Sequence, residues 1–81
     1  MSRAGAVVEV VARALADRPE EVRVSENAHR GQTVVELFMA PGDLGRVIGR
    51  QGRTAAALRT LAAAAAELDG VKVTVEFRDR A

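Results

Sequence analysis

The chain has 81 residues, of which 48% are hydrophobic and 28% are charged, and its formal net charge is +1. This balance is typical of one globular domain, and a chain so short buries only about 60–65% of its unfolded surface, so a partner subunit would help to stabilise it. The absence of cysteine excludes disulfides and thiolate zinc sites. A single histidine, His29, leaves no set of imidazoles for a metal ion or a His-based catalytic group.

The first segment, residues 4–16, is predicted to be a helix that ends before Pro19. Its apolar residues recur at helical spacing at Val7, Val8, Val11 and Leu15. The segment also resembles a signal peptide, because it ends in small residues at 14–16. However, Glu9 and Arg13 interrupt the apolar stretch, and no run of the chain is long enough to cross a bilayer. We therefore expect a core helix, a cytoplasmic location and no membrane insertion.

Two strands are predicted next. Residues 22–26 alternate apolar and polar, which is typical of a half-buried strand, and residues 27–32, which contain Gly31, are predicted to form the hairpin connection. Residues 33–39 form a second strand that is apolar on both faces, with Val34 and Phe38 opposite the other apolar side chains. A strand apolar on both faces is expected at the centre of the sheet.

Two helices and a last strand follow. Pro41-Gly42 breaks the second strand, and Asp43 is predicted to cap a short helix that ends at Ile48. A long helix is expected over residues 53–68, ended by Asp69-Gly70, and residues 71–77 alternate as a strand. The predicted inner face of the long helix consists of Leu58, Leu61, Ala65 and Leu68.

The element order is therefore α-β-β-α-α-β. The strands joined by the helix pair can lie parallel through a right-handed crossover, while the first two strands form an antiparallel hairpin. This predicts an α+β fold, with a three-stranded mixed sheet and three helices packed on one face. We expect one domain over residues 1–81.

The turn Gly49-Arg50-Gln51-Gly52 lies between the two helices and is the most informative motif. Neither glycine has a side chain to block an incoming phosphate, and the second helix starts at the turn with its unpaired N–H groups and positive dipole end. Residues 44–66 contain no acid but hold Arg46, Arg50, Arg53 and Arg59. This locally basic face suits an anionic partner. The alternative is a solvated basic helix face.

Residues 41–53, Pro-Gly-Asp-Leu-Gly-Arg-Val-Ile-Gly-Arg-Gln-Gly-Arg, resemble the signature of the K-homology (KH) domain. The element order is similar to the bacterial, type II form of that fold. The resemblance covers essentially the whole chain and is closest to the small single-KH RNA-binding proteins of the KhpA type. It implies binding of single-stranded RNA, with about four nucleotides held in a narrow groove.

The resemblance also implies the residues that contact RNA. The backbone of the turn would clamp phosphates, Arg50 and Gln51 would form its tip, and part of the last strand would form the opposite wall of the groove. The expected RNA-binding residues are Gly45, Arg46, Ile48, Gly49, Arg50, Gln51, Gly52, Arg53, Ala55, Lys72, Val73 and Thr74. Ala55 stands where many KH domains carry a bulky aliphatic residue, which implies a shallower groove.

The resemblance further implies a homodimer, or pairing with a larger KH-containing protein, and a role in post-transcriptional regulation linked to cell growth or envelope synthesis. The long helix offers a smooth outer surface for such a contact. The candidate dimer residues are Ala56, Ala57, Thr60, Ala63 and Ala64. The alternative explanation is simply that alanine favours helices.

Other functions fit the sequence less well. The glycine spacing matches neither the P-loop nor the dinucleotide-binding pattern, and no nucleophile–base set is present, so we expect no enzyme, cofactor or metal. A helix-hairpin-helix that binds duplex DNA also joins helices through glycines, but the surrounding strands fit that class poorly. A pure dimerisation module with incidental nucleic-acid binding is the remaining alternative.

Overall fold

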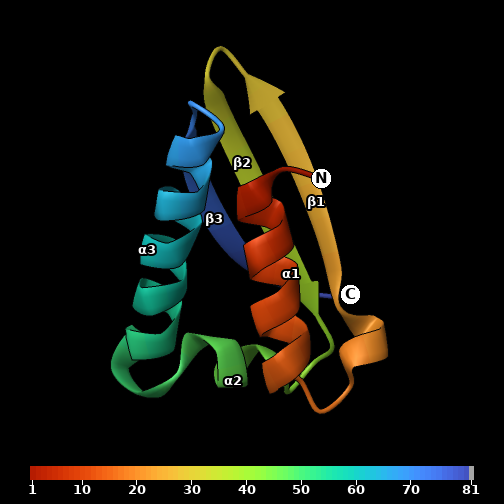
Figure 1. The fold of residues 1–81 in the computed structure, drawn as a ribbon. Helices are drawn as coiled ribbons and strands as arrows, with labels where there is room; N and C mark the ends of the chain where they lie inside the picture. Colours follow the sequence, from red (N-terminus) through yellow and green to blue (C-terminus); the bar gives the residue numbers. More distant parts are fainter. Residues whose placement is uncertain (81) are drawn as a thin grey trace.

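A computed structural model describes residues 1–80 as two layers, with three α-helices on one face of a three-stranded sheet (Figure 1). The strands are Arg23–His29 (β1), Gln32–Met39 (β2) and Lys72–Asp79 (β3). The α-helices are Arg3–Leu15 (α1), Leu44–Ile48 (α2) and Arg53–Leu68 (α3). Two single 3-10 turns also occur, Pro19–Glu21 (η1) and Arg50–Gly52 (η2).

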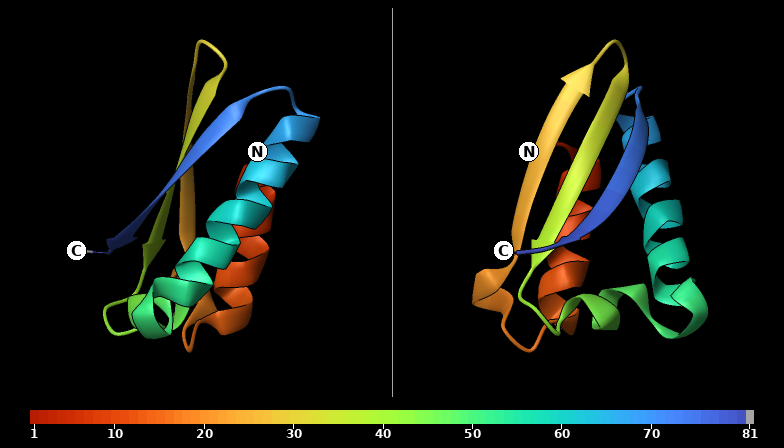
Figure 2. Two further views of the ribbon diagram at one scale, coloured as in Figure 1. Left: turned by 90° about the vertical axis from the view of Figure 1, so that its left-hand side faces the viewer. Right: turned by 180° about the vertical axis from the view of Figure 1, so that it is seen from behind.

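The sheet is mixed, as the sequence predicts. The strand order is β1-β2-β3, with β1 and β2 antiparallel and β2 and β3 parallel, so β2 is the central strand. Viewed edge-on, the sheet and the helices form two separate layers (Figure 2). One face of the sheet is therefore covered by helices, and the other carries no helix. These features are those of the type II KH arrangement.

The core lies between the two layers and is centred on β2. Val35, Leu37 and Met39 are fully buried on the helix side of this strand, and Val8 and Leu58 meet them from α1 and α3. The period-2 alternation of β2 explains this arrangement, since every second side chain points to the same face. Val34 and Phe38 lie on the opposite face and are only half-buried, in agreement with the alternation.

The inner face of α3 differs from the prediction in a consistent way. Leu58 is buried, but Leu61 and Leu68 are 53% and 73% exposed, and Ala65 is half-buried. The helix instead buries Ala55, Leu58, Ala62 and Ala66. Small residues face the core because α3 packs closely against α1 and the sheet, and this leaves two leucines in solvent. The same error occurs in α1, where Leu15 is exposed and Ala4 and Ala12 are buried.

The hairpin connection is also shorter than predicted. β1 continues to His29 and β2 begins at Gln32, so only Arg30 and Gly31 form the turn. Their φ angles are 50° and 76°, the left-handed values of a two-residue hairpin turn of type I′. Residues 27–29 therefore pair in the ladder. Their polar side chains hid the strand, because β1 is an edge strand with mostly exposed side chains.

Two helix ends show different chemistry. Asp69 and Gly70 end α3 as predicted: Gly70 has φ 71°, and the Val71 N–H donates to the Ala66 carbonyl at 3.1 Å. Asp43, however, makes no side-chain cap to α2. Its carboxylate is buried and accepts the Arg18 N–H at 3.0 Å, so it joins the segment after α1 to the start of α2.

None of the helices in residues 1–80 has the length and apolar character needed to cross a membrane.

Candidate nucleic-acid interface

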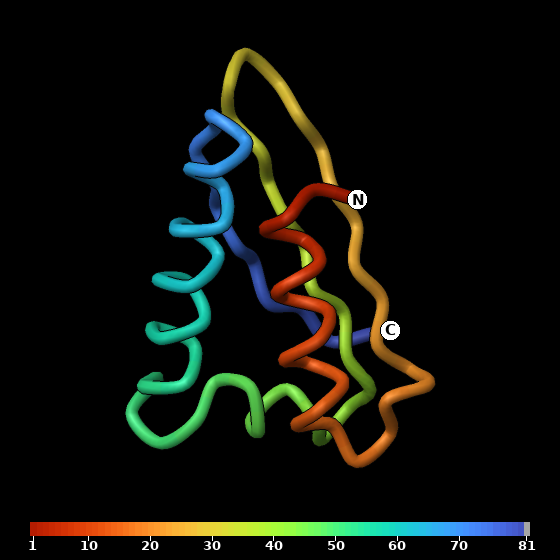
Figure 3. The backbone as a smooth tube through the Cα atoms, viewed as in Figure 1, coloured from red at the N-terminus to blue at the C-terminus, as the bar shows by residue number. Residues whose placement is uncertain are grey.

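The Gly49–Gly52 turn lies at one end of the molecule, between α2 and α3. In the backbone tube it lies at the end opposite to the β1–β2 turn (Figure 3). Gly49, Gln51 and Gly52 have φ angles of 76°, 56° and 73°. Three left-handed residues among four produce a sharp, exposed corner, and only Gln51 adopts this conformation with a side chain. The chain therefore leaves α2 and enters α3 without burying the connecting backbone.

The three glycines of this region are glycine for different reasons. A Cβ atom on Gly49 would lie 2.3 Å from the Thr54 hydroxyl oxygen, so packing alone requires its absence. A Cβ on Gly52 would meet nothing within 4 Å, and only its φ angle favours glycine there. Gly45 has neither constraint, because it lies in α2 and a Cβ would project into open space. A helical glycine costs about 0.5–1 kcal/mol relative to alanine, and neither packing nor a positive φ angle requires one at this position.

The backbone donors at this corner remain available. Within residues 1–80 the N–H groups of Arg50 and Gln51 donate no hydrogen bond, and both residues are exposed. The start of α3 has no side-chain cap and no acidic residue in its first turn, although either would stabilise a helix N-terminus. The unpaired N–H groups and the positive end of the helix dipole therefore face solvent, where an anionic group can accept them.

The arginines divide into two groups by their partners. Among the described residues, the ion pairs involve Arg3, Arg13, Arg46, Arg78 and Arg80. Arg50, Arg53 and Arg59 belong to none of these pairs. Arg46, which the sequence places at the RNA site, forms a 2.8 Å pair with Asp17, so its charge is partly compensated. Arg18, Arg23 and Arg30 belong to none of these pairs either, so the turn and α3 carry three of the six arginines that have no ion pair among the described residues.

The open face of the sheet is electrostatically different. Arg78 forms ion pairs of 2.8 Å with Glu36 and 2.7 Å with Glu76. The hydrogen bond with Glu36, followed by that with Glu76, raises the pKa of Arg78 above its ordinary value. These pairs neutralise the charge of Arg78 on that face, whereas Arg50 and Arg53 at the turn belong to no ion pair among the described residues, so a polyanion gains more from the turn arginines than from Arg78.

The expected residues of β3 are separated by the sheet. Val73 points toward the helices and packs on the core, whereas Lys72 and Thr74 are exposed on the open face of the sheet, where Gln32 Nε2 donates to Thr74 Oγ1 at 3.0 Å. Ile48 is half-buried near the turn, and Ala55 is only 3% exposed, so Ala55 offers almost no surface. The turn residues are thus together, while the β3 residues are not on one face.

The free edge of β3 offers main-chain groups instead. The N–H groups of Lys72 and Arg80 donate to Gly31 and Met39 beside β2, so even-numbered residues turn their polar backbone toward β2. Odd-numbered residues therefore turn theirs outward, because the direction alternates along a strand. Val73, Val75 and Phe77 present N–H and C=O groups at this edge.

A contact across this edge was not predicted from the sequence. The Arg59 Cζ atom lies 4.7 Å from the centre of the Phe77 ring, and its Nη2 donates to the Val75 carbonyl over a long 3.4 Å. Phe77 is half-buried beneath it. The sequence signal for this pair is weak, since the two residues are 18 positions apart and each is unremarkable in its own element.

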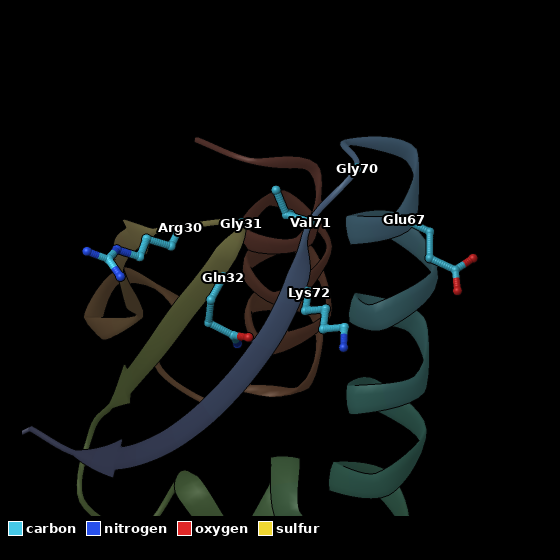
Figure 4. Close-up of a pocket in the computed structure, with 7 residues that line it drawn as sticks. All are labelled: Arg30, Gly31, Gln32, Glu67, Gly70, Val71 and Lys72. Atoms are coloured by element: carbon cyan, nitrogen blue, oxygen red, sulfur yellow. The ribbon is translucent and has the colours of Figure 1, made fainter.

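A separate hollow of about 500 Å³ lies at the other end of the molecule, between the β1–β2 turn and the α3–β3 connection. In the close-up, Arg30 and Glu67 point outward on opposite sides, and Lys72 lies at the start of β3 (Figure 4). Its lining residues are Arg30, Gly31, Gln32, Glu67, Gly70, Val71 and Lys72. Only Lys72 belongs to the expected RNA-binding set, so this hollow is distinct from the turn.

Comparisons with known proteins agree with this architecture. The family model described as "KhpA/KhpB, KH domain" matches residues 6–77. A protein of Clostridium perfringens named RNA-binding protein KhpA is 46% identical over 71 residues, which cover 88% of this chain and 95% of that protein. Proteins of the same name from Caldanaerobacter subterraneus and Treponema pallidum are 46% and 41% identical over 73 residues, covering 90% of this chain and 97% and 91% of those proteins.

No solved structure gives a significant match to the chain. The relatives are named for RNA binding and not for a reaction, in agreement with the expectation that the protein is no enzyme. The matching family model is that of a KH domain and not of a helix-hairpin-helix protein, so the comparisons give no support to the duplex-DNA alternative. With a family model that spans most of its length and relatives that cover nearly all of it, the chain belongs to the KhpA/KhpB family of KH-domain proteins.

Proposed function

We propose that this protein binds short single-stranded RNA at the Gly49–Gly52 turn. The observation that carries the proposal is the exposed corner itself, where the N–H groups of Arg50 and Gln51 are unpaired and two uncompensated arginines flank them. Backbone donors and a helix N-terminus suit phosphate oxygens. The names of the relatives support RNA as the nucleic acid. A KH-type turn of this kind holds about four nucleotides.

The RNA bases, in contrast to the phosphates, would contact the backbone of α2 and the free edge of β3. Gly45 leaves the backbone of α2 open, and the main-chain groups of Val73 at the β3 edge suit hydrogen bonds to base edges. Lys72 and Thr74 lie on the opposite face of β3, so their contribution requires RNA that passes around the edge. We therefore assign the primary contacts to Gly45, Ile48, the turn and Arg53.

A charge-reversal variant of the turn tests the proposal. Arg50→Asp combined with Gln51→Asp places two carboxylates beside the exposed N–H groups, and we expect the affinity for a short RNA to fall by about a hundredfold or more, since several phosphate contacts are lost. Fluorescence anisotropy with a labelled single-stranded oligonucleotide measures this effect. Both side chains are exposed, so thermal unfolding should change little.

The matched control is Arg13→Asp combined with Ala14→Asp. It changes the net charge by the same amount, at exposed positions of α1 away from the turn. We expect it to weaken RNA binding only slightly, through the overall charge. Equal loss in both double variants would show that binding depends on net charge and not on the turn, and would contradict the proposed site.

We further propose self-association through the outer face of α3. The candidate residues from the sequence, Ala56, Ala57, Thr60, Ala63 and Ala64, are all exposed. The structure adds Leu61 and Leu68 on the outside of the same helix, which strengthens the case because exposed leucines gain more from burial than alanines. Linking two weak RNA sites in a dimer raises their joint affinity for one RNA chain.

The same surface suits a larger KH-containing partner, as the resemblance implies. For the cellular role we propose post-transcriptional regulation linked to cell growth or envelope synthesis, in the cytoplasm, from that resemblance alone. Crosslinking and recovery of bound RNA from cells tests this role. Recovery of no RNA above that obtained with the turn variant would contradict it.

A further inference from the structure

Arg59 and Phe77 form a built contact beside the proposed RNA interface. The guanidinium carbon stands 4.7 Å from the ring centre, and one nitrogen donates to the Val75 carbonyl at the free edge of β3. The guanidinium group therefore lies over the phenyl ring, and the long 3.4 Å hydrogen bond restrains it only weakly. The contact with Phe77 is the shorter-range restraint on the position of this side chain.

The position of Arg59 follows from the geometry of α3. Arg59 comes seven residues after Gly52, which is about two helical turns or roughly 10 Å along the axis. Seven residues return to nearly the same side of a helix, so Arg59 projects on the same side of α3 as the second glycine of the turn. The hydrogen bond to Val75 places this side next to the free edge of β3. An RNA strand that is bound at the turn and runs toward β3 would therefore meet Arg59 next.

The Arg59 side chain is open to solvent on the side away from Phe77 and its charge is uncompensated. Arg59 is an exposed residue, and the ion pairs of the described chain do not include it. Bases of single-stranded RNA stack on the planes of arginine side chains as well as on aromatic rings. The protein has only two aromatic residues, and Phe38 lies on the other face of the sheet, so Arg59 is distinguished from the exposed arginines of the turn by its contact with an aromatic ring.

We propose that Arg59 is a specificity-determining residue that stacks on one base of the bound RNA, with Phe77 supporting it from beneath, and that this subsite favours a purine. The inference rests on the proposed RNA binding at the turn. A purine covers the guanidinium plane more fully than a pyrimidine and gains more from the stack. The subsite thus contributes the planar contact that a protein so poor in aromatic residues otherwise lacks.

Replacement of Arg59 by lysine separates stacking from charge, because lysine keeps the cation but has no plane. We expect Arg59→Lys to weaken binding of a purine-containing single strand by about tenfold, as expected for one lost base stack. The second readout uses a short RNA with 2-aminopurine at successive positions. The wild-type protein should quench its fluorescence strongly at one position, and Arg59→Lys should abolish this quenching while binding at saturating protein persists.

Phe77→Leu provides an independent variant, which keeps an apolar side chain over the core but removes the ring under Arg59. It should also reduce the quenching at the same position. Arg13→Lys, an exposed and ion-paired position on α1, is the matched control and should leave affinity and quenching unchanged.

Equal affinity and equal quenching for Arg59→Lys and the wild type would overturn the inference about Arg59. If RNA binding still depended on Arg50 and Gln51 in that case, the proposed function of the turn would stand. Failure of the wild type to bind any single-stranded RNA would overturn both.

Discussion

At the scale of single residues, Gly49 is the position at which the turn depends most on the lack of a side chain. It has φ 76°, and an added Cβ would lie 2.3 Å from Thr54 Oγ1. We expect Gly49→Ala to lower the free energy of unfolding by about 1–3 kcal/mol, because strain and a steric clash act together. Urea denaturation measures this change. A variant as stable as the parent would contradict the described geometry of the turn.

Gly45 should respond in the opposite direction. A Cβ there projects into open space within α2, so Gly45→Ala should raise the free energy of unfolding by up to about 1 kcal/mol through helix propensity. The same variant should weaken RNA binding, because the methyl group stands where the proposed ligand approaches. Denaturation and anisotropy together check both effects. Greater stability with unchanged affinity would place the RNA away from α2.

At the scale of elements, α3 combines a narrow buried face with an exposed apolar one. Leu58→Ala should lower the free energy of unfolding by about 2–4 kcal/mol, since Leu58 is only 1% exposed and lies in the core. Leu61→Ala, in contrast, should change the stability of the monomer by no more than about 0.5 kcal/mol, because that side chain is 53% exposed. Denaturation at low protein concentration compares the two. Similar losses of stability in the two variants would contradict the orientation of α3 in which Leu58 is buried and Leu61 is exposed.

β3 shows how one element takes two roles. Its alternate side chains fill the core on the helix side, while its outward backbone groups remain free because β3 is the last strand of the sheet. An unpaired strand edge generally invites pairing with another chain. Here the Arg59 side chain covers part of that edge at Val75, which limits strand-to-strand association and leaves the remaining groups available to a ligand.

At the scale of the whole molecule, two surfaces carry the proposed functions. The turn occupies one end of the molecule (Figures 1 and 3), and the exposed Leu61 and Leu68 lie on α3. Association through α3 would therefore leave both turns uncovered only if the two copies meet along that outer face. Such an arrangement would present two RNA sites on one particle, which suits a protein whose single sites are weak.

Leu61→Glu tests this association. Placing a carboxylate in the proposed interface should raise the dimer dissociation constant by at least about tenfold, because a buried leucine contributes roughly 1.5–3 kcal/mol. Sedimentation velocity at tens of micromolar measures the change. Val10→Glu is the comparison, since Val10 is also an exposed apolar residue, at 68%, but lies on α1. A parent protein that sediments as a monomer at these concentrations would count against association through α3.

The sequence alone determined the element order, the mixed sheet and the position of the turn, because these depend on local signals. Alternation marked β2 and β3, Asp69-Gly70 marked the end of α3, and the four residues 49–52 marked the corner between two helices. Charge along the chain also located the basic segment that holds Arg50, Arg53 and Arg59, although it could not show that Arg46 in the same segment is ion-paired. The type II KH fold and the family were indicated by the resemblance of residues 41–53 to the KH signature, together with this element order.

Only the tertiary structure decided which faces those elements present. The exposed positions of Leu61 and Leu68 depend on how closely α3 approaches α1, and small residues at Ala62 and Ala66 permit that approach. Arg46 meets Asp17, and Arg59 meets Phe77, only after distant segments have packed. Periodicity ranks residues by hydrophobicity and spacing along one element. Burial and pairing depend on distances between elements, which no local pattern contains.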